Sequence, residues 1–305
     1  MKCGTKSLHH LLAGHPRVFI PAREIHFFDV DDILQHNDFY FFDGMDWSYP
    51  SLRRNRDRYL DWYASFFADA QQHQLLGEDS TCYLASAKAA ERIAQFAKPI
   101  KLIVILRDPT QRAYSHYWHL VRTGRATRSF EDTIRFESAS VVSRSLYQSQ
   151  IRNLLDHIPK DRLHVIAFED FVSNVDVEVG KVCRFLGIDA DLLNYTSNDI
   201  HRNKGRFPKY VRLRLSLNRL LRAEATRQYA DHLIDVPAKT KDSSIFVRSV
   251  AKVHSWINPV TERKPPLRAE TQRMLDDYFS TQNEGLSELV GINVDRNWYP
   301  TQQEA

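Results

Sequence analysis

The first stretch that could do chemistry stands at the start of the 305-residue chain, in residues 2–8, which read Lys-Cys-Gly-Thr-Lys-Ser-Leu. Gly4 would let the backbone approach a phosphate group, while Thr5 and Ser7 add hydroxyls and amides at the start of an expected helix. Lys2 adds a positive charge beside them. The stretch is not a Walker A loop, because the pattern Gly-x-x-x-x-Gly-Lys-Ser/Thr is absent. It therefore predicts an anion-binding loop of another kind.

A second candidate anion site begins at Arg107. It follows residues 102–106, an apolar run rich in β-branched side chains that is typical of a strand buried on both faces of a parallel sheet. Pro109 suits the first turn of the helix expected over residues 112–121, and Ser115 lies about two turns into it. Open α/β sheets bind ligands at this edge. For an isolated arginine and serine, a structural cap and an ordinary surface serine would be the simpler interpretation.

A general base could come from residues 23–29, Arg-Glu-Ile-His-Phe-Phe-Asp, which follow a short strand expected at 18–20. Strand-like alternation would place Glu24 and His26 on one face. A carboxylate near cations is ionised and can take a proton, whereas histidine is the commoner general base. A structural alternative pairs Glu24 with Arg23 or a loop lysine and packs His26 on the two phenylalanines.

The two anion sites together resemble the donor-binding segments of sulfotransferases that use 3′-phosphoadenosine 5′-phosphosulfate (PAPS). Residues 2–8 resemble the family's 5′-phosphosulfate loop, usually Lys-x-Gly-Thr-Thr-x-Leu, and the pattern from Arg107 to Ser115 resembles its 3′-phosphate segment. The resemblance implies that Arg107 and Ser115 fix the 3′-phosphate and that Lys2 neutralises the bridging oxygen as sulfate leaves. It also implies that the 5′ end is held by Lys2, Cys3, Gly4, Thr5, Lys6, Ser7 and Leu8. Lys6 stands where the family commonly has threonine.

Residues 23–28 are similar to the Lys/Glu-Glu-x-His/Gln-Phe-Phe segment of the glycan-modifying branch, the heparan sulfate sulfotransferases. That resemblance implies that Glu24 is the catalytic base, with His26 as its rival because a histidine does this work in the cytosolic branch. The basic loop of Lys204, Gly205 and Arg206 matches the position of the family's loop over the 3′-phosphate. One departure is Asp79, where the family frequently has lysine, and it indicates an acceptor of different charge.

The resemblance covers nearly the whole chain and implies a three-layer α/β fold with a parallel central sheet, the P-loop-like sulfotransferase fold, as a single domain over residues 1–305. A phosphate loop normally follows a buried strand, but only Met1 precedes Lys2, so we expect the first strand to be missing through truncation. Further strands are expected at 75–78 and 163–168. Helices are expected over 53–70, 88–96, 130–136, 145–158, 177–186, 210–222 and 265–279.

The composition restricts the remaining function classes. The net charge is only +4 with 43% apolar residues, which argues against a nucleic-acid partner. Three widely spaced cysteines form neither a disulfide framework nor a zinc motif, and no membrane span is visible, so a cytoplasmic protein is expected. No metal is required. The predicted function is sulfuryl transfer from PAPS to a hydroxyl of a small molecule or glycan, with product adenosine 3′,5′-bisphosphate.

Two alternatives stay open at this point. One is a nucleotide-dependent kinase, which needs a Walker A loop and a carboxylate for Mg²⁺ after a strand; Asp108 follows a strand, but Pro109 and the spacing of Arg107 and Ser115 favour PAPS. The other is a catalytically inactive, anion-binding member of the same fold. Neither the identity of the acceptor nor the oligomeric state follows from the sequence.

Overall fold

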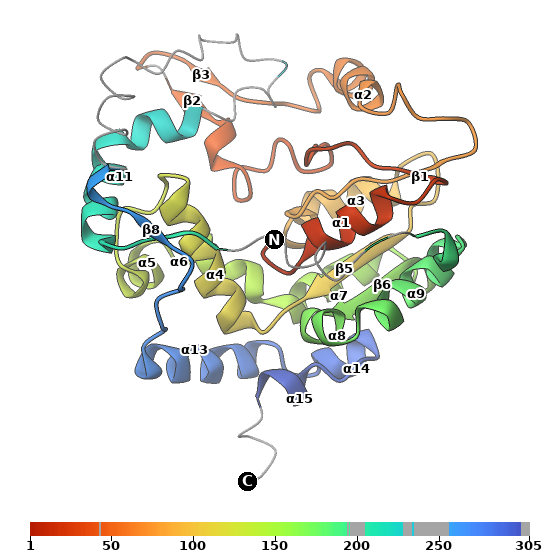
Figure 1. Cartoon of the computed structure of the whole chain (residues 1–305). Coiled ribbons are helices and arrows are strands. Elements are labelled where there is room, and N and C mark those ends of the chain that lie inside the picture. Colours follow the sequence, from red (N-terminus) through yellow and green to blue (C-terminus); the bar gives the residue numbers. More distant parts are fainter. Residues whose placement is uncertain (43, 194, 196–204, 228–233, 235–255, 300–305) are drawn as a thin grey trace.

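The computed structural model describes residues 1–42, 44–193, 195, 205–227, 234 and 256–299. Four of the described strands form two parallel pairs. β1 (Val18–Phe19) pairs with β4 (Leu75–Leu76), and β5 (Leu102–Leu106) pairs with β6 (Leu163–Ala167) in a register that sets Leu102 opposite Leu163. All four strands lie where the sequence predicted them, which gives a mixed α/β fold with parallel strands (Figure 1).

Helices cover both faces of the β5–β6 pair and make a three-layer arrangement. Ile103 and Ile105 pack into the apolar core on one face, and Leu102 and Val104 pack into the core on the other. This follows from the alternation of side chains along a strand. The covering helices are α1 (Thr5–Ala13) and α9 (Val175–Leu186) on the first face, and α3 (Ala87–Ala94) and α7 (Tyr147–His157) on the second.

The central strand is less enclosed than predicted. Leu106 is fully buried, but the four preceding residues of β5 are only half-buried, and Leu75 and Leu76 of β4 are exposed. Within the described ranges, β5 has a strand partner on one edge only, so its side chains lack the cover that a second neighbour would give.

The remaining predicted helices are present, most of them with shifted ends: α2 (Arg56–Ser65), α4 (Pro109–Arg122), α5 (Phe130–Phe136), α11 (Val211–Arg227) and α13 (Ala269–Gln282). Further short helices that were not predicted are α6 (Ser138–Val141), α8 (Phe168–Ser173), α14 (Leu286–Val290) and α15 (Asp295–Trp298). None of the described helices is long and apolar enough to cross a bilayer. α13, α14 and α15 follow one another along one end of the molecule, in blue in Figure 1.

Two antiparallel pairs were not predicted, and one predicted strand-like stretch is a loop. The first pair joins β2 (Phe41–Phe42) to β3 (Trp47–Ser48). A second such pair joins β7 (Phe207–Pro208) to β8 (Val260–Thr261). Conversely, the stretch around Glu24 and His26 is a loop and not a strand, because His26 has a φ of 58°, which no strand residue adopts.

Three hydrogen bonds fix the turn between β5 and α4. Asp108 caps α4 by accepting a hydrogen bond from the Gln111 amide at 2.8 Å, and Pro109 is the first helical residue. The Asp108 amide donates to Glu169 Oε1 at 3.1 Å, and the Tyr147 hydroxyl donates to the Arg107 carbonyl at 3.0 Å. The helix therefore starts at the carboxyl end of the strand, as predicted, with Arg107 held at its tip.

Candidate active site

The two predicted anion sites meet at the carboxyl end of β5. Arg107 Nη1 donates a hydrogen bond to the Lys2 carbonyl oxygen at 3.1 Å, across 105 positions of sequence. Burial, together with the neighbouring charges of Arg122, Lys6 and Arg107, lowers the pKa of the Lys2 ammonium to about 8. Positive charges held this close in a half-buried place repel one another, and a multiply charged anion between them would relieve that repulsion.

Gly4 begins α1 with a φ of 86°, and a Cβ atom there would lie 3.0 Å from the Phe168 ring. Glycine is therefore required for two reasons, the left-handed backbone and the close approach. The same ring supports Arg107, whose guanidinium carbon lies 4.7 Å from its centroid. Phe168 thus forms a floor beneath both predicted phosphate sites. This role of Phe168 could not be predicted from the sequence, because Phe168 resembles the last apolar residue of a strand.

The other residues of the loop divide between the site and the core. Cys3 and Leu8 are buried, and Leu8 packs among the apolar side chains of α1 and α9. Their predicted contribution to donor binding is therefore limited to backbone groups. Lys6 is exposed, Thr5 is half-buried, and the amide of Ser7 donates to the Gly4 carbonyl at 2.9 Å.

Ser115 is half-buried on α4 and lies four residues from both Gln111 and His119, so the three side chains share one face of the helix. Burial lowers the pKa of His119 to about 3, the charges of Arg125, Lys2 and Arg122 lower it too, and Glu24 acts in the opposite direction. This face of α4 is therefore close to both Lys2 and Glu24. The role of Ser115 in binding the 3′-phosphate stays a prediction.

Glu24 lies beside these cations. Its Oε2 is 3.3 Å from His26 Nε2 and accepts a hydrogen bond from Thr81 Oγ1 at 2.7 Å. Burial would raise the pKa of Glu24, but the hydrogen bond and charge of His26 and the hydrogen bond from Thr81 outweigh it and lower the pKa to about 2. The Thr81 carbonyl accepts a hydrogen bond from the Met1 amine at 3.2 Å, which ties this carboxylate to the start of the loop.

Both nitrogens of His26 face carboxylates, since Nδ1 lies 3.6 Å from Asp29 Oδ1 and Nε2 faces Glu24. Burial alone would lower the pKa of His26, but hydrogen bonds to Asp29 and Glu24 raise it well above the usual value. The guanidinium of Arg23 stacks on the Phe66 ring, with its carbon 4.7 Å from the centroid. The side chain of Glu24 is 26% exposed against 11% for His26, so Glu24 is the more accessible of the two candidate bases.

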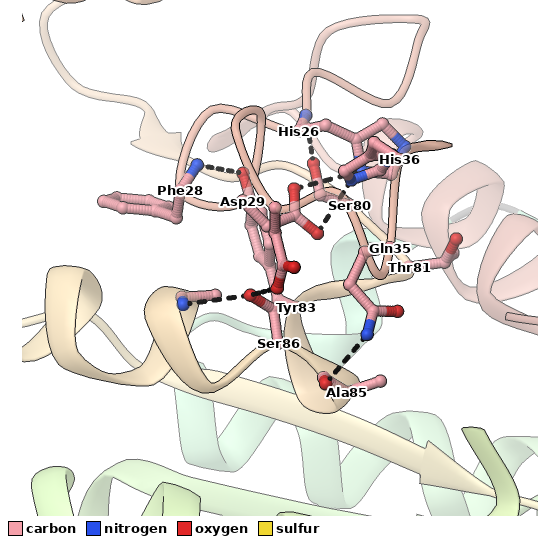
Figure 2. A network of polar contacts seen from close by, with 12 residues as sticks. His26, Phe28, Asp29, Gln35, His36, Ser80, Thr81, Tyr83, Ala85 and Ser86 are labelled. Carbon is pink, nitrogen blue, oxygen red and sulfur yellow. Dashed lines mark hydrogen bonds and ion pairs between the residues drawn. The ribbon is translucent and has the colours of Figure 1, made fainter. Parts of the chain in front are cut away.

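A polar network holds this loop against the segment after β4 (Figure 2). The His26 amide donates to Ser80 Oγ at 2.8 Å, and the Phe28 amide donates to the Tyr83 hydroxyl at 3.2 Å. Ser80 and Tyr83 both donate in turn to Glu78, at 2.6 and 2.7 Å. Burial raises the pKa of Glu78 to about 6, although hydrogen bonds from Ser80 and Tyr83 oppose the shift. The network therefore positions the loop that carries the candidate base Glu24.

The predicted basic loop is only partly described. Lys204 lies outside the described residues, Arg206 is exposed, and Gly205 lies against the ring of Phe207, which packs edge-on against Trp118 at 5.4 Å. Among the described residues no hydrogen bond or ion pair joins Gly205 or Arg206 to Arg107. Their role in donor binding stays a prediction.

Lys264 is a candidate cofactor ligand that the sequence did not single out. Its Nζ lies 3.4 Å from Gln111 Oε1 and 4.5 Å from the centroid of the Tyr114 ring, and the Tyr114 hydroxyl donates to the Pro265 carbonyl at 3.0 Å. Burial and the charge of Arg107 lower the pKa of Lys264 to about 8. The lysine therefore adds a cation to the first turns of α4. Its signal in the sequence, a basic pair before two prolines, is too common to be specific.

The fold and this site define an α/β protein that gathers cations and a carboxylate at the end of a parallel strand. The family model described as the sulfotransferase family matches residues 1–191, so the chain belongs to that family. The α/β fold is shared with a sulfotransferase from Alicyclobacillus acidocaldarius, with a TM-score of 0.62 at 21% identity, over 97% of this chain and 94% of that one.

Curated relatives belong to the glycan branch that the sequence resembles. Heparan sulfate glucosamine 3-O-sulfotransferase 5 of Homo sapiens is 24% identical over 258 residues, which is 80% of this chain and 66% of that protein. Heparan sulfate glucosamine 3-O-sulfotransferase 3B1 of Homo sapiens is 27% identical over 195 residues, 61% of this chain and 44% of that protein. The chain thus spans from under half to about two thirds of the length of these relatives.

Proposed function

We propose that this protein transfers a sulfuryl group from PAPS to a hydroxyl group of a carbohydrate. The observation that carries the proposal is the hydrogen bond between Arg107 and the Lys2 carbonyl, because it unites the two segments expected to bind opposite ends of the donor. Membership of the sulfotransferase family supports the reaction class. The names of the curated relatives, which are heparan sulfate glucosamine sulfotransferases, support a glycan acceptor.

The donor would lie across the carboxyl end of β5. Lys2 would face the bridging oxygen of the phosphosulfate, with the amides of the loop and the first turn of α1 around the 5′-phosphate. Arg107, Ser115 and Lys264 would surround the 3′-phosphate, with Phe168 holding the guanidinium in place. The 3′-phosphate distinguishes PAPS from ATP, so these residues would decide which nucleotide binds.

The acceptor hydroxyl would approach Glu24. As the hydroxyl oxygen attacks sulfur in line with the leaving phosphate, the carboxylate takes its proton, and Lys2 neutralises the charge that develops on the bridging oxygen. Asp79 stands where the family frequently has lysine, and its Oδ1 lies 3.2 Å from His9 Nδ1. This position therefore offers no lysine to the acceptor. The acceptor is therefore expected to place less negative charge at this point than an acceptor suited to a lysine.

The kinase alternative is disfavoured by the position of Asp108. A phosphoryl transferase needs a carboxylate that can ligate Mg²⁺ after the strand, whereas Asp108 Oδ1 is engaged as the cap of α4. An inactive member of the fold would bind the nucleotide product and fail to transfer sulfate. That alternative is decided by a measurement of turnover.

The testing experiment compares the binding of adenosine 3′,5′-bisphosphate and ADP by calorimetry, followed by transfer of labelled sulfate from PAPS to a panel of glycans. We expect the bisphosphate to bind more tightly than ADP and the preference to be lost in Arg107→Ala. The matched control is Arg135→Ala, an exposed arginine on α5. Equal affinity for both nucleotides would refute the donor assignment. Selective binding without transfer to any glycan would leave the donor assignment intact and refute sulfuryl transfer to a glycan, which is the result that an inactive member of the fold would give.

A further inference from the structure

Behind Glu24, on the opposite side of the His26 ring, lies a cluster of metal-ligating side chains. We propose that His26, Asp29, His36 and Cys82 together bind one divalent metal ion of the zinc type. One ligand atom from each residue lies within 4.8 Å of all the others, and all four residues are buried. Figure 2 shows the two histidines and Asp29 converging from one loop. The proposal does not depend on sulfuryl transfer, because metal binding is measured without donor or acceptor.

The site is built before any ion arrives. His26, Asp29 and His36 come from the loop after β1, while Cys82 comes from the segment after β4. The two segments are fixed to each other on both sides of Cys82, since Ser80 accepts from the His26 amide and Tyr83 accepts from the Phe28 amide. His36 is oriented by stacking on Phe39, with ring centroids 4.5 Å apart. The ligands are thus positioned by contacts that do not involve their ligand atoms.

Asp29 indicates that a cation belongs at the centre. Its side chain is fully buried, and each of its carboxylate oxygens faces an imidazole nitrogen. His36 Nε2 lies 3.0 Å from Oδ2, and His26 Nδ1 lies 3.6 Å from Oδ1. A buried carboxylate is costly unless positive charge compensates it. An ion bound by both imidazoles and by the carboxylate would satisfy all three groups at once.

The ligand types select the metal. Two imidazole nitrogens, one thiolate and one carboxylate match the ligands of zinc, whereas Mg²⁺ and Ca²⁺ prefer oxygen alone. Zinc bonds of about 2.0–2.3 Å would bring neighbouring ligand atoms to roughly 3.3–3.8 Å, so the cluster would contract by about 1 Å. On binding, the thiol of Cys82 releases its proton and the ion takes the place of the proton on His26 Nδ1.

The bound ion would act on the base through His26. With Nδ1 on the metal, the only ring proton of His26 is on Nε2, 3.3 Å from Glu24 Oε2. The ring would then be fixed in one tautomer and one orientation as a hydrogen-bond donor to Glu24. His36 and Cys82 would be positioning residues, because they touch the ion and not the substrate.

The test uses chelator-treated full-length protein titrated with Co²⁺, with Zn²⁺ as the competitor. Wild type is expected to bind one equivalent and to show a thiolate-to-cobalt charge-transfer band in the near ultraviolet. Cys82→Ser should abolish the band, and His36→Gln should weaken zinc binding by more than about tenfold, the loss typical of removing even an outer partner of a ligand. The matched control is Cys183→Ser, a buried thiol on α9, which should keep both the band and the affinity.

Circular dichroism of each variant separates loss of a ligand from loss of the fold. If Cys82→Ser does not fold, His36→Gln carries the test, because it leaves the thiol and the band and lowers only the affinity. The proposal is overturned if wild type binds no stoichiometric metal. It is equally overturned if folded Cys82→Ser retains the cobalt band, or if folded His36→Gln binds zinc as tightly as Cys183→Ser.

Discussion

Trp298 near the end of the described chain donates a hydrogen bond from Nε1 to Glu169 Oε2 at 3.0 Å. The other oxygen of Glu169 accepts from the Asp108 amide, so α15 is linked through one carboxylate to the turn that carries Arg107. Trp298 also packs against Tyr147, with ring centroids 5.7 Å apart, and Tyr147 bonds the Arg107 carbonyl. A tryptophan far from the donor site in sequence therefore helps to place its main arginine.

Trp298→Phe should lower the free energy of unfolding by about 1–2 kcal/mol, because it removes a buried hydrogen bond and some volume. The variant should also bind adenosine 3′,5′-bisphosphate more weakly, since the turn before α4 loses one of its supports. Chemical denaturation and calorimetry measure the two effects. Trp256→Phe, at an 89% exposed tryptophan, is the control and should change neither; identical behaviour of the two variants would contradict the role of Trp298.

Phe168→Ala should weaken binding of adenosine 3′,5′-bisphosphate, because Arg107 loses the ring on which it stacks. A cation–π contact contributes about 0.5–2 kcal/mol, so we expect a loss of roughly 2- to 30-fold in affinity. Combining Phe168→Ala with Arg107→Ala should cost less than the sum of the two single changes. Additive losses would show that the ring acts independently of the arginine. Phe136→Ala is the matched control, since two other arginines stack on that exposed ring.

Binding of the bisphosphate should take up protons between about pH 8 and 9. The pKa values of Lys2 and Lys264 are lowered to about 8, so both ammonium groups lose charge as the pH rises through 8. A bound anion stabilises the charged forms and raises these pKa values, which draws protons from the buffer and makes affinity fall above pH 8. Calorimetry in buffers of different ionisation enthalpy measures the uptake.

Two variants assign that proton uptake. Lys2→Met and Lys264→Met should each remove part of it, and the exposed Lys98→Met should leave it unchanged. Uptake that persists in full in both site variants would place neither lysine at the nucleotide.

Glu24→Gln should lower kcat for sulfate transfer by about 10²- to 10⁴-fold, the usual contribution of a general base. Its affinity for adenosine 3′,5′-bisphosphate should stay close to that of wild type, because Glu24 is expected to act on the acceptor. Steady-state transfer assays measure kcat, and calorimetry measures the affinity for the bisphosphate. The control is Glu91→Gln on the exposed side of α3; a Glu24→Gln enzyme with normal kcat would remove Glu24 from the mechanism.

The sequence predicted the parts of the site that depend on local patterns. The run of apolar residues in β5, followed by Pro109, predicts a strand and a helix start within a few positions, and the structure confirms both. The capping role of Asp108 was not predicted. Strand-like alternation from Glu24 to His26 was wrong, although the two side chains do meet. They meet because a left-handed residue turns the chain, which apolar patterning does not reveal.

Contacts between segments that are distant in sequence could not be predicted from sequence patterns. Lys264 approaches Gln111 only after the chain returns along β8, and Phe168 approaches Gly4 only because α1 lies over the end of β6. The four proposed metal ligands follow no recognised spacing, since Cys82 joins the other three through the packing of one loop on another. Sequence patterns report neighbours along an element, while these groups are neighbours through the tertiary fold alone.

Lys2 and His26 are the two residues other than glycine that adopt a positive φ in the described part of the chain, at 67° and 58°. Each such residue costs of order 1 kcal/mol or more, and glycine would relieve that cost. Selection of variants for heat resistance alone would therefore favour glycine at positions 2 and 26. Variants selected in that way would be expected to keep the fold and to lose both Lys2 and His26.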